Sequence, residues 1–566
     1  MVAVPSPNLP TGISGIHSAR DLGSVRRGGA NQSFRNEAGP YTHLWEFLGY
    51  LPRRKAAVDG LVEVFLRELN PVFDAVYEPT FWAHYNKFWD RKYGEDDMDA
   101  VDLRWLSLLF IVLAFGELLV CPQPCSIEQQ RESEESSLHF FWASRKAVVV
   151  SPTFSGESPD LVRAGILISR YLLHLKRIPE SWLTQSFAVR MAQAQGMHID
   201  GKGWGLPRKV LEIKRRLWAS LYYLDRTTSL ALGRPYTIND KHCTPMDISN
   251  IWVDDVDAEA AEAAQPLSMD QPTRVTYLVF QQHLSRISGR IHDECFNLTP
   301  GAARATYDKV IAFDEALQDW SRTLPSYFAL KRTDYSLDEL HPYLVWHRLY
   351  LHSAYHFIRV TLHRSYVLLP SITDRYKASR EACIASACAD LTARLTLHQP
   401  SMADRIRFNV AAHSLFNSAL VLGVIAVRDP RSERTQAILE DLRAFCAKQN
   451  EDPWTNQFEL AEIKVVELCI ASVNRSRRPS PVRQEADVPN AQHDVSSSRV
   501  VDGIGHNHEA ASVMQTYNFE GLPYDDHDIR YDDEWLNTFF GQNRAFPEPT
   551  DLQTWEELLG TLESKR

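Results

Sequence analysis

Apolar residues recur at helical spacing along most of this chain, and that pattern limits the folds that the chain can adopt. A clear example is the stripe formed by Leu61, Val64, Phe65, Leu66 and Leu69. A period of three to four residues is the spacing of one face of an α-helix. Strand signals, such as sustained apolar–polar alternation between Asn-Gly or Asp-Gly turns, are almost absent. We therefore predict an all-α fold built as one large multi-helix domain.

The helical patterns follow one another with polar breaks between them. They cover residues 103–120, 137–150, 160–176, 180–196, 208–232, 272–295, 302–322, 343–369, 376–397, 404–427, 434–448 and 457–473. Three of them have a helix-start signal, at Ser158, Ser181 and Asp404, and Pro71 is expected to end the helix that contains Leu61.

The longest apolar stretch covers residues 105–116. A helix needs roughly 20 apolar residues to cross a membrane. This stretch is shorter, so we predict a buried core helix and no membrane association.

Composition divides the chain into four parts. Residues 1–40 are rich in Gly, Ser, Asn, Pro and Arg, which predicts a disordered N-terminal tail. Residues 41–473 hold the helical patterns. Residues 474–515 are polar, with Pro and Ser, and are predicted to be a disordered linker. Residues 516–566 form a tail of a different composition.

This last tail mixes acidic residues with aromatic and aliphatic ones. Between Tyr517 and Leu562 it has eleven acidic residues against Arg530 and Arg544. Such a composition is typical of disordered activation segments, in which the carboxylates keep the aromatic side chains hydrated and available to a partner's groove. The contact residues that we predict are Trp535, Leu536, Phe539 and Phe540.

Charge and cysteine content exclude some classes of protein. The net charge of −11 does not suggest that the whole chain binds nucleic acid. Short basic groups at residues 26–27, 53–55 and 475–478 could serve nuclear import or phosphate contact, or could be solvated surface. The eight scattered cysteines indicate buried, reduced thiols in a nuclear or cytosolic protein, and the first residues lack a secretory signal.

The most informative block is 187–247. Glu212 and Arg216 are four residues apart and can pair across one helical turn. Gly233 is a candidate helix C-cap, and Pro235 cannot extend the helix beyond it. The charged residues of this block could form a salt-bridge network or a small anion pocket; they are Arg215, Arg216, Asp225, Arg226 and Arg234.

The same block resembles the signature of the fungal-specific transcription factor domain, which is the middle homology region of zinc-cluster regulators. The resemblance extends from about Leu51 to Leu369, and less clearly to about residue 473. The residues that carry it are Pro79, Thr80 and Phe81, then His198, Arg215, Arg216, Trp218, Asp225 and Arg226, and finally Gly233, Arg234 and Pro235.

The resemblance implies a helical regulatory domain in a nuclear transcription regulator of a metabolic gene set, with secondary-metabolite clusters among the family's usual targets. It implies two kinds of partner. One is the transcription machinery or its coactivators, bound through the acidic tail. The other is a second copy or a DNA-binding relative, in a homo- or heterodimer.

The chain also departs from the family pattern. Family members usually carry a six-cysteine zinc cluster, but here no cysteine precedes Cys121, and the pair Cys121 and Cys125 has no further ligands at zinc spacing. We therefore assign no cofactor, and direct DNA binding is not implied. Ala219 stands where the family often has a second tryptophan after Trp218.

Three interpretations of the missing cluster stay open. The chain could be an activator that works through its tail. It could be a cofactor or negative regulator that acts through a zinc-cluster partner. The sequence could also begin after a first exon that encodes the cluster.

An enzyme is the remaining alternative, because terpene synthases are all-α and use acidic clusters. The acidic runs at residues 254–257 and 525–528 do not follow a helix that faces a cavity. The sequence at 292–295 lacks metalloprotease spacing, and the two histidines at 506–508 lie in the predicted linker, where we expect them to be solvated. We assign no catalytic or metal-binding residue and predict that the chain is not an enzyme.

Overall fold

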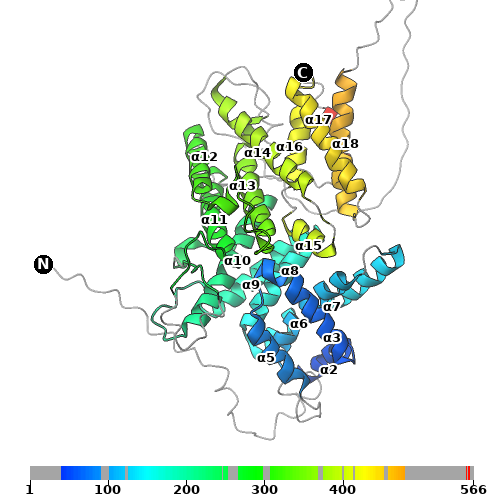
Figure 1. Ribbon diagram of the computed structural model, residues 1–566, viewed down its shortest axis with the longest axis vertical. Helices are drawn as coiled ribbons and strands as arrows, with labels where there is room; N and C mark the ends of the chain where they lie inside the picture. The colour runs from blue at the N-terminus through cyan, green and yellow to red at the C-terminus, as the bar shows by residue number, and fades with distance from the viewer. Residues whose placement is uncertain are drawn as a thin grey trace, which may run out of the picture. The chain divides into compact units, whose positions relative to one another are not determined.

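The computed structural model describes the helical part of the chain (Figure 1). It covers residues 40–90, 101–121, 125–244, 247–252, 265–296, 306–367, 374–397, 399, 401–411, 415–451, 455, 457–477, 553, 556, 557, 559 and 560. Every regular element in these residues is a helix, and none of them is a strand. The all-α fold class is therefore confirmed. Most of the two tails predicted to be disordered lies outside the described residues.

The chain forms two compact units. The first contains residues 1–293, 312–355 and 396–415, and the second contains residues 294–311, 356–395 and 416–566. The helices of the first unit are α2 (Pro40–Tyr50), α3 (Lys55–Glu68), α4 (Asn70–Phe73), α5 (Glu78–Trp89), α6 (Leu103–Val120), α7 (Ile127–Ser155), α8 (Pro159–His174), α9 (Ile178–Ala194), α10 (Arg208–Leu232), η3 (Asp240–His242), α11 (Thr276–Cys295), η5 (Ser326–Phe328) and α15 (Met402–Val410).

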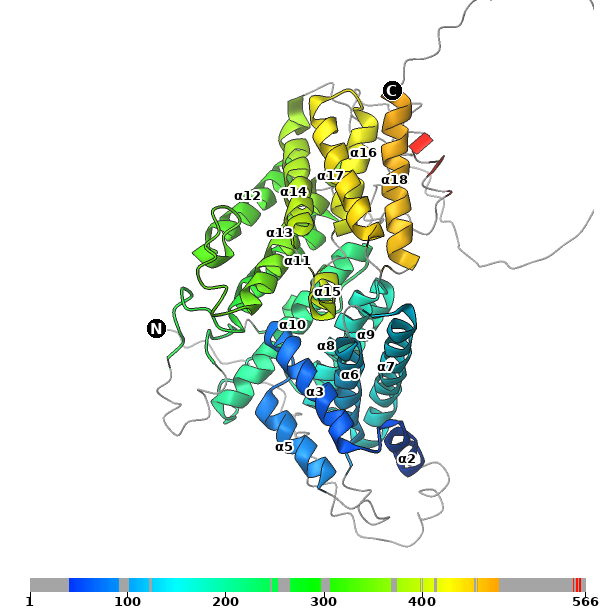
Figure 2. The same ribbon diagram turned by 45° about the vertical axis from the view of Figure 1, so that its right-hand side comes forward.

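The second unit contains η6 (Asp374–Tyr376), α14 (Lys377–Thr396), α16 (Leu415–Arg428), α17 (Glu433–Asn450) and α18 (Gln457–Arg477). Residues of α12 (Tyr307–Arg322) and α13 (Tyr343–Val367) belong to both units. Figures 1 and 2 show α16, α17 and α18 side by side, and α17 packs on α18.

Helix α6 is the centre of the first unit. It is apolar on every side and packs against α3, α7 and α8. It is long and apolar enough to cross a membrane, but 78% of it is buried inside the protein. The predicted core helix at residues 105–116 is therefore confirmed, because neighbouring helices cover the surface that lipid would otherwise have to cover.

Some helix starts follow the sequence signals and others do not. Ser158 caps α8 by accepting a hydrogen bond from the Asp160 N–H, as predicted. The predictions for Ser181 and Asp404 were wrong. Helix α9 begins at Ile178, and the buried Ser181 hydroxyl donates to the Ser169 carbonyl. Helix α15 is capped by Ser401, to which the Asp404 N–H donates.

Three helix boundaries also differ from the prediction. Helix α7 starts about ten residues early, because a capping box between Ser126 and Gln129 nucleates a polar first part that has no apolar stripe. The helix predicted at 404–427 is two helices, α15 and α16, which belong to different units. Pro71 does not end α3; it stands in the first turn of α4, where its missing N–H costs no hydrogen bond.

Candidate functional site

Helix α10 is the centre of the block that the sequence singled out. Four of its charged side chains are buried: Glu212, Arg216, Asp225 and Arg226. Charged residues are rarely buried unless they are paired. The partners of these four residues therefore determine what the helix can hold in place.

The first cluster surrounds Arg216. Its Nη1 lies 3.4 Å from Asp74 Oδ2, and its Nε lies 3.6 Å from Glu212 Oε1. Its Nη2 donates to the Ile251 carbonyl at 2.6 Å, while Glu212 accepts the Ser249 N–H at 3.0 Å. Asp74 is the left-handed residue that ends α4. One guanidinium thus ties α10 to the end of α4 and to the segment around Ile251.

The neighbouring Arg215 holds the loop that enters α10. It donates to Asp200 Oδ1 at 2.6 Å and lies 3.8 Å from Glu212 Oε2. Burial raises the pKa of Asp200, but the hydrogen bond and the charge of Arg215, together with the hydrogen bond and the charge of Lys202, outweigh burial, so the net pKa is lowered. Asp200 is therefore held in its charged form.

The second cluster lies further along α10. Asp225 accepts the N–H groups of Thr237 at 2.9 Å and Ile238 at 2.8 Å. Arg226 donates to the Ile238 carbonyl at 3.0 Å, and its Nη2 lies 3.0 Å from Asp240 Oδ2. The Arg226 guanidinium also covers the Tyr236 ring at 3.5 Å from the centroid. Two adjacent residues of opposite charge thus hold residues 236–240 against the helix.

The Gly-Arg-Pro turn makes this return of the chain possible. Gly233 caps α10 with φ 60° and ψ 32°, a left-handed conformation that glycine adopts without steric cost. The Arg234 N–H donates to the Ser229 carbonyl at 2.9 Å, and the Arg234 guanidinium lies over the Trp182 ring. Trp182 in turn donates to the Pro235 carbonyl at 3.2 Å. The predicted C-cap is confirmed.

The other signature residues have more ordinary packing positions. Pro79 stands in the first turn of α5, and the buried Phe81 ring lies 6.0 Å from the Trp105 ring, whereas Thr80 is exposed. The His198 ring lies 6.1 Å from that of the buried Trp218, and burial lowers the pKa of His198. Of these residues, Phe81 and Trp218 are buried and help to pack the first unit, whereas Pro79 and Thr80 are exposed.

The geometry decides between the two readings of the charged residues. The clusters of Arg216 and Arg226 are ten residues apart on α10, which is about 15 Å along a helix. In the described part of the chain, the charged residues of the block therefore form separate clusters and do not line one anion pocket. These residues are Arg215, Arg216, Asp225, Arg226 and Arg234. Sequence reasoning missed the partners Asp74, Asp200 and Asp240, because nothing in their local pattern marks them.

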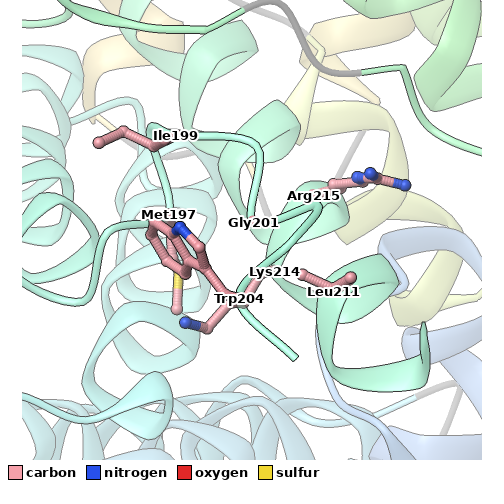
Figure 3. A pocket seen from close by; sticks show the side chains of 7 residues that line it. All are labelled: Met197, Ile199, Gly201, Trp204, Leu211, Lys214 and Arg215. Atoms are coloured by element: carbon pink, nitrogen blue, oxygen red, sulfur yellow. The ribbon is translucent and has the colours of Figure 1, made fainter. Parts of the chain in front are cut away.

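A small cavity lies beside Arg215 (Figure 3). Its lining residues are Met197, Ile199, Gly201, Trp204, Leu211, Lys214 and Arg215. The Trp204 ring lies so close to Gly196 and Gly201 that a Cβ there would be 2.7 Å and 3.2 Å from it. The cavity has room for about one water molecule, whereas a metabolite needs at least about 300 Å³.

Among the described residues, no group of three or more His, Cys, Asp or Glu side chains lies close enough together to bind a metal ion. The eight cysteines are free and do not fit a six-cysteine zinc cluster. In the sequence at 292–295, Asp293 accepts a hydrogen bond from the Tyr236 hydroxyl, and the His292 ring lies against the Tyr236 ring. The acidic runs at 254–257 and 525–528, and residues 506–508, lie outside the described residues, as do Trp535, Leu536, Phe539 and Phe540.

The fold and the α10 clusters define an all-helical domain held together by buried ion pairs. Residues 62–322 match the family model of the fungal specific transcription factor domain. The chain therefore carries a fungal specific transcription factor domain, and the resemblance seen in the sequence is confirmed. Both clusters of α10 lie inside the matched residues.

Curated relatives point the same way. The chain is 25% identical over 363 residues to the Zn(2)-C6 fungal-type transcription factor mpsB of Macrophomina phaseolina, covering 62% of this chain and 46% of that protein. It is 26% identical over 358 residues to the Zn(2)-C6 fungal-type transcription factor pigI of Monascus ruber, covering 62% and 41%. It is 22% identical over 335 residues to the equisetin cluster transcription factor eqxF of Fusarium heterosporum, covering 57% and 46%. The chain thus spans less than half the length of these relatives.

Proposed function

We propose that this chain is a nuclear transcription regulator whose helical domain controls the expression of a metabolic gene set. The observation that carries this proposal is the family match over residues 62–322, which contains both ion-pair clusters of α10. The names of the relatives support it, and one of them is named as the transcription factor of the equisetin cluster. In this proposal the domain is a scaffold and not an enzyme.

The output of the regulator is assigned to the acidic tail. Residues 516–566 combine carboxylates with aromatic side chains, a composition suited to the apolar grooves of coactivators. The contact residues are Trp535, Leu536, Phe539 and Phe540. Aromatic side chains supply most of the apolar area in such contacts, so their removal is expected to abolish binding.

A reporter assay tests this assignment. Residues 516–566 are fused to a heterologous DNA-binding domain, with and without the double substitution Trp535→Ala and Phe539→Ala. We expect the wild-type tail to activate the reporter and the double variant to lose most of that activity. The matched control, Asn537→Ala, removes a polar side chain from the same stretch and is expected to keep it. A tail that does not activate, or a double variant as active as the control, contradicts the assignment.

A second candidate is a cofactor or negative regulator that reaches DNA through a zinc-cluster partner. It is favoured by the cysteines, which are free and do not fit a zinc cluster. In this case the purified chain has no tight, specific DNA binding at physiological salt, and it is recovered on promoters only when the partner is present. Specific binding by the chain alone would rule this candidate out.

Deletion of the gene separates the two directions of control. Loss of an activator lowers the transcripts of the target genes, whereas loss of a negative regulator raises them. Unchanged transcripts across the genome would contradict both candidates.

A further inference from the structure

The end of the acidic tail contains a buried leucine. The described residues there are helical, and four of them are exposed: Gln553, Glu556, Glu557 and Gly560. Leu559, however, exposes only 3% of its surface. A short helix cannot bury one of its own leucine side chains to this extent. Leu559 must therefore contact another apolar surface of the protein.

Helical geometry separates the exposed residues from Leu559. At about 100° per residue, the four exposed residues fall within an arc of about 100°, and Leu559 lies outside that arc. The sequence places Trp555 four residues and Leu552 seven residues before Leu559, which is same-face spacing in a helix. The segment therefore has the pattern of an amphipathic helix, with glutamates on the exposed side.

The surface that covers Leu559 belongs to the second unit. The C-terminal residues are part of this unit, together with α16, α17 and α18. Figures 1 and 2 both place the described part of the segment, drawn in red, beside α18. The docking surface therefore lies in the second unit, beside α18.

We propose that the C-terminal segment that contains the described helical residues Gln553, Glu556, Glu557, Leu559 and Gly560 is an intramolecular anchor, which docks through Leu559 on the second unit beside α18. The acidic and aromatic residues 517–546 then lie between two attachment points, the end of α18 at Arg477 and the anchor.

The length of the connection allows this arrangement. Residues 478–552 number 75, and a chain of that length can reach about 250 Å when fully extended. The entropic cost of closing a loop rises only slowly with its length. Since Glu556 and Glu557 are exposed, the charged side of the anchor stays in water while the apolar side is covered.

Hydrogen exchange on the full chain tests the anchor. We expect amides of 551–562 to exchange at least about tenfold more slowly than in an unfolded peptide of the same sequence. Leu559→Asp should bring them to the unfolded rate and should accelerate exchange in α18, because a buried carboxylate prevents docking. Leu559→Ala should lie between the two. Thermal unfolding checks that the rest of each variant remains folded.

Glu556→Gln is the matched control, since it changes an exposed side chain of the same helix. It should keep the wild-type exchange pattern. The anchor is wrong if the wild-type segment exchanges at the unfolded rate, if Leu559→Asp changes nothing, or if Glu556→Gln removes protection as fully as Leu559→Asp. These measurements do not involve transcription. The anchor can therefore be disproved while the proposed function holds, and the proposed function can be disproved while the anchor holds.

Discussion

At the scale of single residues, the buried charges of α10 decide how the first unit is held together. Arg216 and Arg226 each bind a carboxylate and a backbone carbonyl that lie outside α10. The segments they hold also bury apolar side chains, among them Phe73, Ile238 and Ile251. A buried cation that loses its partner is costly, so these clusters depend on every member.

Replacing Arg216 tests this dependence. Arg216→Met should lower the free energy of unfolding by about 3 kcal/mol, because the buried Glu212 keeps only the more distant Arg215 as its cation and Asp74 loses its ion pair with Arg216. Chemical unfolding followed by tryptophan fluorescence measures the change. Arg131→Met breaks the exposed pair with Glu135 and should cost less than about 0.5 kcal/mol. Equal effects of the two substitutions would show that the cluster does not support the fold.

A buried histidine should make stability depend on pH. Burial lowers the pKa of His347 to about 3, against the opposing hydrogen bond with the Val72 carbonyl. Its pKa in the unfolded chain is about 6.5, so the unfolded state binds the proton first. The contribution of His347 is complete above pH 6.5 and is lost as the pH falls toward 3, by about 1.4 kcal/mol per pH unit.

The measurement is the free energy of unfolding between pH 7 and pH 5 for the wild type and for His347→Gln. From pH 7 to pH 5 the free energy of unfolding of the variant should fall less steeply than that of the wild type, by the contribution of about one proton. This difference in slope is expected whatever the stability of the variant at pH 7. His174, whose pKa burial also lowers to about 3, should behave in the same way. An unchanged slope in His347→Gln would refute the prediction.

At the scale of elements, close helix crossings depend on small residues. A Cβ at Gly116 of α6 would lie 2.7 Å from the Leu61 carbonyl oxygen of α3. A Cβ at Gly165 of α8 would lie 2.6 Å from the Ala188 Cβ of α9. Helical periodicity predicts which face is buried, but it does not reveal how closely two backbones approach.

Two glycines near the α3–α6 crossing give opposite expectations. Gly116→Ala should destabilise the first unit by about 1–3 kcal/mol, since the new methyl group meets the α3 backbone. Gly60→Ala, next to Leu61 on α3, meets nothing within 4 Å and should stabilise by up to about 1 kcal/mol. Thermal or chemical unfolding gives the sign of each change. If both substitutions stabilise, the α3–α6 crossing is looser than described.

At the scale of the whole molecule, the state of the cysteines reports on the packing of both units. All eight are free; Cys121, Cys383, Cys446 and Cys469 are buried, and the others are partly buried. Burial raises the pKa of Cys469 to about 12, so its reactive thiolate is scarce at neutral pH.

Thiol titration checks this arrangement. Eight thiols should react in denaturant without any reductant, whereas the four buried ones should react in the native protein only as fast as it unfolds. Electrophoretic mobility should be the same with and without reductant. Fewer than eight reactive thiols in denaturant would indicate a disulfide and contradict the described state.

The sequence by itself determined the helical class, the core position of α6, the C-cap at Gly233 and the family block of α10. These features depend on local periodicity and on residues that favour one backbone conformation. Only the tertiary structure decided the partner of Arg216, which is Asp74, 142 residues away. It also decided the break between α15 and α16 and the burial of Leu559. Such pairings depend on the path of the whole chain, so residues with no local signal become neighbours only after the helices have packed.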